Sequence, residues 1–409
     1  MNFIYYIGYI KYKSFLMKEL INESFIMKNE NLIIYIMMLG TFGVLSTEMG
    51  VVGILPQIAE YFSVDITQAG LFVSLFALTI AICGIFMPLV FSKFDRKKSF
   101  TLVLAVFTVF STIGAFVSDF NIALICRIIP AIFHPIYCGL ALTVAAEIVE
   151  PEKAQDAVSK VIMGVSAGMI VGVPITTFVA TNFGYQFSML WFSLVTFIAL
   201  IATVIFFPAL PGKEQSYGSQ VKVATTGVFI ISVLGVIFLN GGMYTAYSYI
   251  SEFLNSITQI FGTELSIVLF IYGVASIVGN WVGAKLLNNK SKLTVLTFPI
   301  IFSVLMIGVF ILSGAKIPMI TLMVFWGLLA GIGNDISQYL MVSAAPDAPE
   351  FANGIFLSMG NVGVTLGTTI AGAVVVGMGV QYVMIAAIAV MIIDLALLLI
   401  RTNKYHIEG

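Results

Sequence analysis

Charged residues are scarce in this sequence. Asp, Glu, Lys and Arg together make up 10% of its 409 residues, whereas soluble domains carry about 25%. Histidine occurs only twice, and all three cysteines fall within apolar runs. A clustered set of catalytic side chains, a disulfide framework or a cysteine–histidine metal site is therefore not expected. We predict that the chain is not an enzyme and that it binds no metal and no cofactor.

Long apolar runs fill the sequence instead. Hydrophobic residues make up 60% of the chain, and a membrane-spanning helix needs about 20 mostly apolar residues. Twelve such runs predict an all-α membrane protein with twelve transmembrane helices. The first run is too long for the apolar core of a signal peptide and lacks a small-residue cleavage site, so we expect it to be retained. The predicted spans are 32–54, 67–91, 99–118, 121–148, 161–181, 187–208, 226–250, 263–287, 293–313, 317–344, 354–376 and 381–400.

The positive charges are distributed unevenly between the two sides of the predicted membrane domain. With the amino terminus inside, 17 of the 19 Lys and Arg residues fall on the cytoplasmic side, and only Arg127 and Lys316 do not. Such a bias sets the orientation of multi-pass proteins. We therefore predict that both termini face the cytoplasm.

The spacing of the spans predicts two six-helix bundles joined by a polar connection. The segment before the first span carries aromatic residues and lysines but no clear span, and the chain could start near Met27 instead. A flexible or interfacial tail is the alternative. The predicted division is an N-terminal tail 1–31, a bundle 32–208, a cytoplasmic linker 209–225, a second bundle 226–400 and a cytoplasmic tail 401–409.

One apolar run carries glycines at every fourth residue, which would form a smooth stripe on a helix and let a second helix approach closely. A register of 195 residues aligns Gly168 with Gly363 and Gly172 with Gly367, so the two halves are related as an internal repeat. Twofold repeats of membrane helices are typical of secondary transporters, whose site lies between the halves. The alternative is that the glycines only pack helices. The stripe comprises Gly164, Gly168 and Gly172 and ends at Pro174, where we expect the helix to be disturbed.

Three polar residues of the first half lie inside predicted spans. Glu48 lies about two-thirds of the way along the first span, where a carboxylate costs about 2.5–3.5 kcal/mol unless it faces water, a partner or a proton. Arg127 cannot lose its charge, and His134 lies seven residues later on the same helix face. Each has an alternative interpretation. Glu48 could be a structural carboxyl, Arg127 could reach the outer interface, and His134 could only pack.

The second half offers a larger set of polar and aromatic candidates. Asn240 and Tyr244 lie four residues apart, on one helix face, and Asp335 is a second acid inside a span. Tyr247 suits a binding site or an interfacial aromatic belt equally well. For Asp394 we predict only a buried hydrogen bond. The remaining candidates are Trp326, Asn334 and Gln338.

The loop after the second span resembles a conserved loop of the major facilitator superfamily, Gly-x-x-x-Asp-Arg-x-Gly-Arg-Arg. Here Pro88 takes the place of the first glycine, Ser92 that of the aspartate and Asp95 that of the second glycine, and Arg96 lies among the bases. We expect Ser92, Asp95 and Arg96 to act in helix packing or gating. A plain topology signal is the alternative.

Taken together, these segments make the chain similar to bacterial twelve-helix drug/proton antiporters of that superfamily, most of all to the sugar (arabinose-type) efflux branch. The adjacent residues Asn334 and Asp335 depart from that branch. The segments that carry the resemblance are Thr47-Glu48, Val52–Leu55, Arg127 with His134, Tyr244–Ile250, Phe325–Gly327, Gln338 and Ala345–Ala348.

The resemblance implies an alternating-access exporter of the bacterial cytoplasmic membrane, driven by protons and carrying a sugar or sugar-like solute. A multidrug or nucleoside exporter is the alternative within the superfamily, and a membrane sensor or enzyme is the alternative outside it. The expected partners are a small solute, protons and lipid but no nucleic acid, and the expected state is a monomer. We assign proton coupling to Glu48 before Asp335. The expected substrate-binding residues are Arg127, His134, Asn240, Tyr244, Tyr247, Trp326, Asn334 and Gln338.

The predicted topology is tested by reporter fusions. Fusions after Glu214 and after Ile400 should both report a cytoplasmic location, because the linker and the carboxyl terminus follow an even number of spans. A periplasmic signal from either fusion would overturn the count of twelve.

Overall fold

The structure is a computed structural model and describes residues 29–212, 224–346 and 349–404, all of which lie in helices or in short connections. The predicted start near Met27, most of the predicted linker and the end of the predicted C-terminal tail lie outside these residues. The first half contains a helix over 29–50, η1 (Val51–Ile54), α2 (Leu55–Phe62), α3 (Ile66–Ala69), α4 (Leu71–Ser92), α5 (Arg96–Phe116), α6 (Phe120–Glu147), η2 (Pro151–Lys153), α7 (Ala154–Phe183) and α8 (Tyr185–Phe206). The second half contains α9 (Gly227–Tyr247), α10 (Ile250–Phe253), the π-helical turn η4 (Leu254–Thr258), α11 (Gly262–Leu312), α12 (Lys316–Ala344), α13 (Pro349–Met378), η5 (Val380–Tyr382) and α14 (Val383–Lys404).

Eleven helical segments of the described chain are long and apolar enough to cross a membrane. One of them, α11, contains two spans. The helix α11 has 51 residues, so at 1.5 Å per residue it would be about 77 Å long, far beyond the ~30 Å of a bilayer core. Its backbone leaves the helical conformation at Lys290, with φ −148° and ψ 58°. The two arms match the predicted spans 263–287 and 293–313. The all-α fold with twelve spans is confirmed.

Local sequence explains where several helices begin. The carboxylate of Asp95 accepts a hydrogen bond from the backbone N–H of Lys98 at 3.0 Å and so caps α5. Asp119 caps α6 in the same way, accepting from the N–H of Ile122 at 2.9 Å. Short acceptor side chains at these positions satisfy N–H groups that have no partner within the helix.

The first span extends beyond its predicted end at residue 54, because the helix resumes after a break. The α-helix ends at Gly50, a 3₁₀ turn follows, and α2 then continues to Phe62. Pro56 lies in the first turn of α2, where its missing N–H costs no hydrogen bond. By contrast, Pro174 does not end its helix, since α7 continues to Phe183. The expected disturbance at Pro174 is therefore less than a break.

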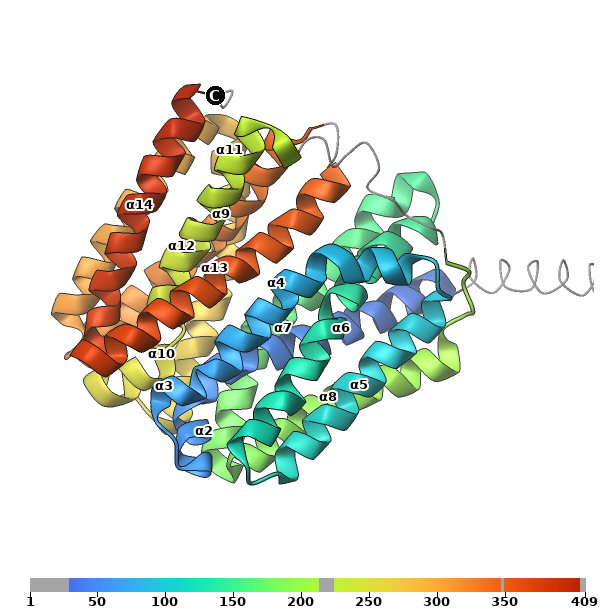
Figure 1. Ribbon diagram of the computed structural model, residues 1–409, viewed down its shortest axis with the longest axis horizontal. Helices are drawn as coiled ribbons and strands as arrows, with labels where there is room; N and C mark the ends of the chain where they lie inside the picture. The colour runs from blue at the N-terminus through green and yellow to red at the C-terminus, as the bar shows by residue number, and fades with distance from the viewer. Residues whose placement is uncertain (1–28, 213–223, 347–348, 405–409) are drawn as a thin grey trace, which may run out of the picture.

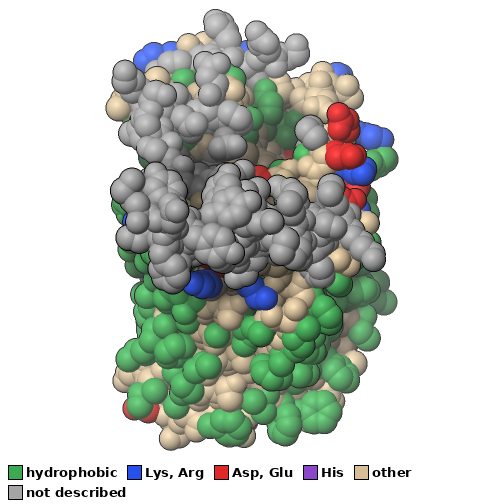
Figure 2. Space-filling view, turned by 90° about the vertical axis from the view of Figure 1, so that its right-hand side faces the viewer, with side chains coloured by type: hydrophobic (Ala, Val, Ile, Leu, Met, Phe, Trp, Pro, Cys, Tyr) green, Lys and Arg blue, Asp and Glu red, His purple; other side chains and the backbone are tan. Residues whose placement is uncertain are grey.

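The charged and apolar side chains separate on the surface. Figure 2 shows hydrophobic side chains covering the lower part of one side of the molecule, while Lys, Arg, Asp and Glu gather higher up. Many large hydrophobic side chains are exposed, including Phe116, Trp281 and Ile311. Such a surface suits lipid contact, because apolar patches of this extent are rare on soluble monomers.

The glycine stripes pack the same pairs of helices in both halves. A Cβ atom at Gly168 in α7 or at Gly363 in α13 would lie 2.6–3.1 Å from three atoms of the first helix of its own half, so only glycine fits there. Each contact partner in the second half lies 195 residues after its counterpart. The partners are Phe42 O, Leu45 Cβ and Ser46 N around Gly168, and Ile237 O, Asn240 Cβ and Gly241 N around Gly363.

The two halves lie side by side in Figure 1, blue to green and yellow to red, and contact each other through α4 with α13 and through α7 with α11. At the centre, the hydroxyl of Tyr244 donates a hydrogen bond to the sulfur of Met49 at 3.5 Å. These two residues are 195 positions apart, so their contact lies at the pseudo-twofold axis. Nearby, the hydroxyl of Ser251 donates to the carbonyl of Val52 at 2.8 Å. The broken end of the first span therefore meets its counterpart in the second half.

The packing predicts that replacing two glycines of α13 by leucine lowers stability to different extents. A Cβ atom at Gly367 in α13 would lie 2.8 Å from the backbone nitrogen of Thr245, whereas one at Gly377 would have no neighbour within 4 Å. Gly367→Leu should therefore lower the free energy of unfolding by about 1–3 kcal/mol through overpacking. Gly377→Leu is the matched control and should leave stability unchanged. Equal melting temperatures for the two purified variants in detergent would contradict the packing argument.

Candidate functional site

A buried acid and a buried histidine meet inside the first half. Glu48 lies at the end of the first helix, and His134 lies in the middle of α6. Their side chains are 8% and 7% exposed, and Glu48 Oε2 lies 2.9 Å from His134 Nε2. The structure thus joins two residues that the sequence had placed only on separate helices.

Arg127 lies on the same face of α6 and holds the neighbouring helices. Its Nη2 donates to the carbonyl of Glu48 at 2.9 Å, and its Nε donates to the carbonyl of Phe72 at 3.4 Å. The guanidinium carbon lies 4.0 Å from the centre of the Phe76 ring, a cation–π geometry. Arg127 is 5% exposed, so its side chain is buried within the first half.

Aromatic and thiol groups enclose the histidine. The rings of Phe76 and Phe107 lie 6.0 Å and 6.3 Å from the His134 ring, centre to centre. The sulfur of Cys138, one turn further along α6, lies 4.0 Å from the imidazole nitrogens. These neighbours exclude water from the pair and fix the orientation of the imidazole.

This arrangement can bind and release protons. With one proton, the pair is either a carboxylate beside an imidazolium or a neutral acid beside a neutral imidazole, and a second proton gives a neutral acid beside an imidazolium. Protons on groups this close belong to the pair rather than to either residue. Arg127, hydrogen-bonded to the Glu48 carbonyl, supplies a permanent positive charge nearby.

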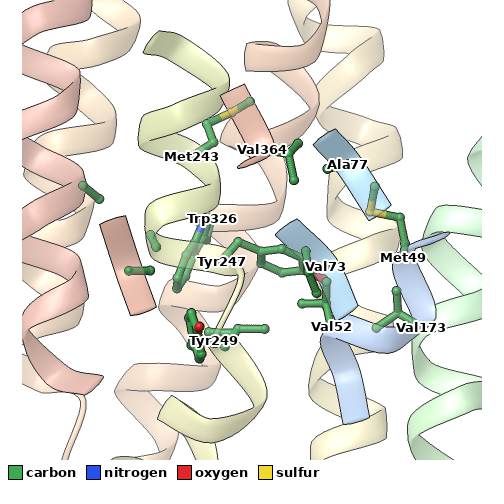
Figure 3. Close-up of a cluster of buried hydrophobic side chains, with 14 of the residues drawn as sticks. Met49, Val52, Val73, Ala77, Val173, Met243, Tyr247, Tyr249, Trp326 and Val364 are labelled. Carbon is green, nitrogen blue, oxygen red and sulfur yellow. The ribbon is translucent and has the colours of Figure 1, made fainter. Parts of the chain in front are cut away.

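The second half presents aromatic rings towards the interface. The rings of Tyr247 and Tyr272 stack at 4.7 Å, and each meets the ring of Trp326 edge-on at 6.3 Å. The Tyr244 ring lies 6.2 Å from that of Tyr247. Figure 3 shows Tyr247 directed from α9 across the interface, towards side chains of the first half. First-half side chains of the same buried cluster as Tyr247 and Trp326 include Met49, Val52, Val73, Ala77 and Val173.

The predicted amide residues do not join this aromatic group. The amide nitrogen of Asn240 donates to Ser337 Oγ at 3.0 Å and to the carbonyl of Val236 at 2.8 Å, both within the second half. Gln338 is exposed and donates to Asn353 at 3.2 Å. Its neighbour Asn334 is also exposed. The predicted set therefore divides into a buried N-terminal pair, a central aromatic group and separate amides.

The two remaining intramembrane acids lie in the second half, away from the pair. Asp335 is half-buried in α12 against Gly283 of α11, and its Oδ2 has no hydrogen-bond partner among the described residues. Asp394 in α14 is completely buried, and neither of its oxygens has a partner within the described part of the chain. The hydrogen bond that we predicted for Asp394 is therefore absent there.

The loop between α4 and α5 is tied to the end of the first half. Arg96 is 1% exposed, its Nη1 donates to the carbonyl of Ser92 at 3.0 Å, and its backbone N–H donates to the carbonyl of Leu210 at 2.8 Å. Asp95 caps α5.

Gly164 of the glycine stripe lies against Thr41 and the Met38 carbonyl of the first helix.

Two contributors to these clusters were missed from the sequence. Tyr272 completes the aromatic group, and its position inside an apolar span was the only signal. Phe76 stacks on Arg127, but nothing separates it from the other 33 phenylalanines. Among the described residues, no three His, Cys, Asp or Glu side chains gather as a metal site.

Comparison with known sequences gives the family. The Major Facilitator Superfamily profile matches residues 37–350. The inner membrane transport protein YdhP of Escherichia coli (strain K12) is 28% identical over 366 residues, which cover 88% of this chain and 93% of YdhP. An uncharacterized MFS-type transporter, YtbD of Bacillus subtilis (strain 168), is 29% identical over 350 residues, covering 83% and 87%. A protein of Mannheimia succiniciproducens named "Probable sugar efflux transporter" is 23% identical over 361 residues, covering 88% and 91%.

Comparison with solved structures gives the same fold. The nucleoside transporter NupG superposes with a TM-score of 0.74 at 14% identity, over 91% of this chain and 99% of NupG. A bacterial homolog of the human lysosomal transporter Spinster, inward-facing and unoccupied, superposes with a TM-score of 0.73 at 14% identity, over 92% and 97%. The match of profile and fold over most of the chain shows that this protein belongs to the Major Facilitator Superfamily of membrane transporters and is not an enzyme.

Proposed function

We propose that this transporter couples the inward movement of protons to the export of a small solute by alternating access. The observation that carries the proposal is the buried pair of Glu48 and His134, 2.9 Å apart, with Arg127 hydrogen-bonded to the Glu48 carbonyl. An intramembrane acid is costly to retain without a function. We expect the protein to be a monomer of the bacterial cytoplasmic membrane, with both termini inside.

The coupling follows from the environment of Glu48. Glu48 is buried and lies 2.9 Å from His134, so we expect changes in these contacts to load or release a proton. In the outward-open state the pair takes up a proton from outside, and in the inward-open state it releases the proton to the cytoplasm. Because Glu48 lies next to the interface residue Met49, movement of the halves and the proton affinity of the pair are linked.

We propose a sugar or sugar-like solute as the first candidate cargo. Relatives named "Probable sugar efflux transporter" support it, at 23% and 24% identity. The few fixed charges at the interface suit an uncharged solute. Amide and hydroxyl groups of Asn240, Tyr244 and Gln338 could hydrogen-bond hydroxyl groups of such a solute once the halves separate.

A multidrug or nucleoside exporter is the second candidate, and the aromatic group favours it. Tyr244, Tyr247 and Trp326 bring aromatic rings, and Met49 brings a polarisable sulfur, to this region. The rings of Tyr244 and Tyr247 and the sulfur of Met49 bind planar apolar rings well. Asn240 is meanwhile occupied by Ser337. Tyr247→Ala should therefore reduce binding of a planar solute more than binding of a sugar.

Glu48→Gln tests the proton carrier. Glutamine keeps the shape and hydrogen bonding of the protonated acid but cannot release a proton, so uphill export should be lost while solute binding remains. Export is measured in everted vesicles energised by a proton gradient. The control is Asp335→Asn, which we expect to retain pH-driven export, because we assign Asp335 to substrate shaping or helix pairing. Retained export in Glu48→Gln with loss in Asp335→Asn would reverse the assignment.

The cargo is tested in the same vesicles. Sugars, nucleosides and cationic dyes are added one class at a time, and solute-dependent collapse of the proton gradient is followed by fluorescence. A response to sugars alone supports the first candidate, and a response to nucleosides or dyes supports the second. If no solute of any class moves protons in the wild-type protein, the proposal of proton-coupled export loses its support.

A further inference from the structure

A small cavity lies inside the first half, beside Arg127. Its volume is about 20 Å³, enough for one water molecule. Thr47, Ser111, Arg127 and Tyr185 bring polar side chains to its wall, and the rest of the wall is formed by Phe72, Phe110, Gly114, Ala123, Cys126, Pro130, Met189 and Phe192. A site of this size with four polar residues in its wall has room for a water molecule.

The cavity lies close to the face opposite the termini, the outer face of the predicted topology. Its wall includes Gly114, two residues before α5 ends, Ala123, three residues after α6 begins, and Tyr185, the first residue of α8. Tyr61 stacks near Tyr185, with ring centres 4.7 Å apart. Its hydroxyl accepts a hydrogen bond from the exposed amide of Gln186 at 3.2 Å. Polar groups thus extend from the outer surface to the cavity.

Arg127 connects this cavity with the helix that carries the buried acid. It lines the cavity, and its hydrogen bonds to the carbonyls of Glu48 and Phe72 attach α6 to the first helix and to α4. The Phe76 ring covers one face of the guanidinium at 4.0 Å. His134 lies seven residues deeper on α6, about 10 Å further along the helix axis. A proton that enters the cavity therefore meets Arg127 before it can reach the Glu48–His134 pair.

We infer that Arg127 is the barrier that prevents protons from leaking from the outer face to Glu48 through the first half while the halves are closed on that side. A guanidinium keeps its charge at every physiological pH, so it cannot pass a proton on. A fixed positive charge beside a narrow water site also repels protons, as in channels that exclude them. The inference rests on the proposed proton coupling by Glu48 and adds a role that transport alone does not require.

Few titratable or charged groups surround Arg127, so the effect of its charge on proton leak can be separated from theirs. The first helix brings Glu48, α6 itself brings His134 and Cys126, and α8 brings Tyr185. Helix α4 contains no charged residue, and α5 has its bases only at the opposite end. No second cation faces the cavity among the described residues.

The test is passive proton leak, measured without any solute. Purified protein is reconstituted into liposomes with an imposed pH gradient, and collapse of the gradient is followed with an internal pH dye. Arg127→Gln should speed the collapse on the order of tenfold, because the repulsion at the barrier is lost. Arg127→Lys keeps the charge and should leak as slowly as the wild-type protein. Ser111→Ala alters the cavity wall but not the barrier and is the matched control.

A double variant decides whether the leak uses the proposed route. Adding Glu48→Gln to Arg127→Gln should restore slow collapse, because the protons then have no acid to reach. Phe76→Leu removes only the ring that packs on Arg127 and should leak faster than the wild-type protein but more slowly than Arg127→Gln. It replaces Arg127→Gln in the test if that variant does not fold. A wild-type leak rate in the folded Arg127→Gln protein, or a leak that persists in the double variant, would overturn the inference. The proposed function fails separately, if wild-type protein shows no solute-dependent proton movement.

Discussion

The structure depends most on the way a buried carboxylate, a buried imidazole and a buried guanidinium stabilise one another. Each group alone would be expensive inside a membrane, by several kcal/mol for an ion without a partner. Glu48 and His134 share a contact of 2.9 Å, and Arg127 is held by two carbonyls and an aromatic ring. Removing any one member leaves the others incompletely compensated. The constraint therefore fixes the relative positions of the first helix, α4 and α6.

Close helix packing supplies the precision that this cluster needs. The glycine stripes bring the first helix against α7, and α9 against α13, with backbone atoms near contact. Because the partners repeat at a spacing of 195 residues, the two halves are built on one packing pattern but carry different side chains. The first half holds the cluster of Glu48, His134 and Arg127, and the second half holds the stacked rings of Tyr247, Tyr272 and Trp326. The division places the proton-binding groups and the aromatic groups on opposite sides of the interface, where relative movement of the halves acts on both.

Much of the fold could be predicted from the sequence, because spans depend on composition over about 20 residues. The twelve spans and the glycine-mediated packing follow from such local patterns. The break after Gly50 and the merging of two spans into α11 were not predicted, since both depend on the backbone conformation of a few residues.

The site was predicted less completely. Glu48, Arg127 and His134 were identified because polar groups are rare in apolar runs, but their meeting depends on how helices align with one another, which one chain's periodicity does not reveal. Asn240 and Gln338 were expected to bind the substrate together with Tyr244, yet their amides bond to Ser337 and Asn353. Asn240 is buried, where an unpaired amide is costly, so it bonds to Ser337 on the neighbouring helix.

The proposed sharing of a proton between Glu48 and His134 can be tested directly, because the chain has only two histidines. Labelling all histidine nitrogens with ¹⁵N gives two sets of imidazole signals, one from His134 and one from His406, which lies outside the described residues. The account predicts that Glu48→Gln shifts the His134 signals and leaves the His406 signals at the position of a solvated imidazole. The signals are followed from pH 5 to pH 9, a range of about two units on either side of neutrality that spans imidazole titration. Identical His134 signals in the wild-type and Glu48→Gln proteins over this range would contradict the account.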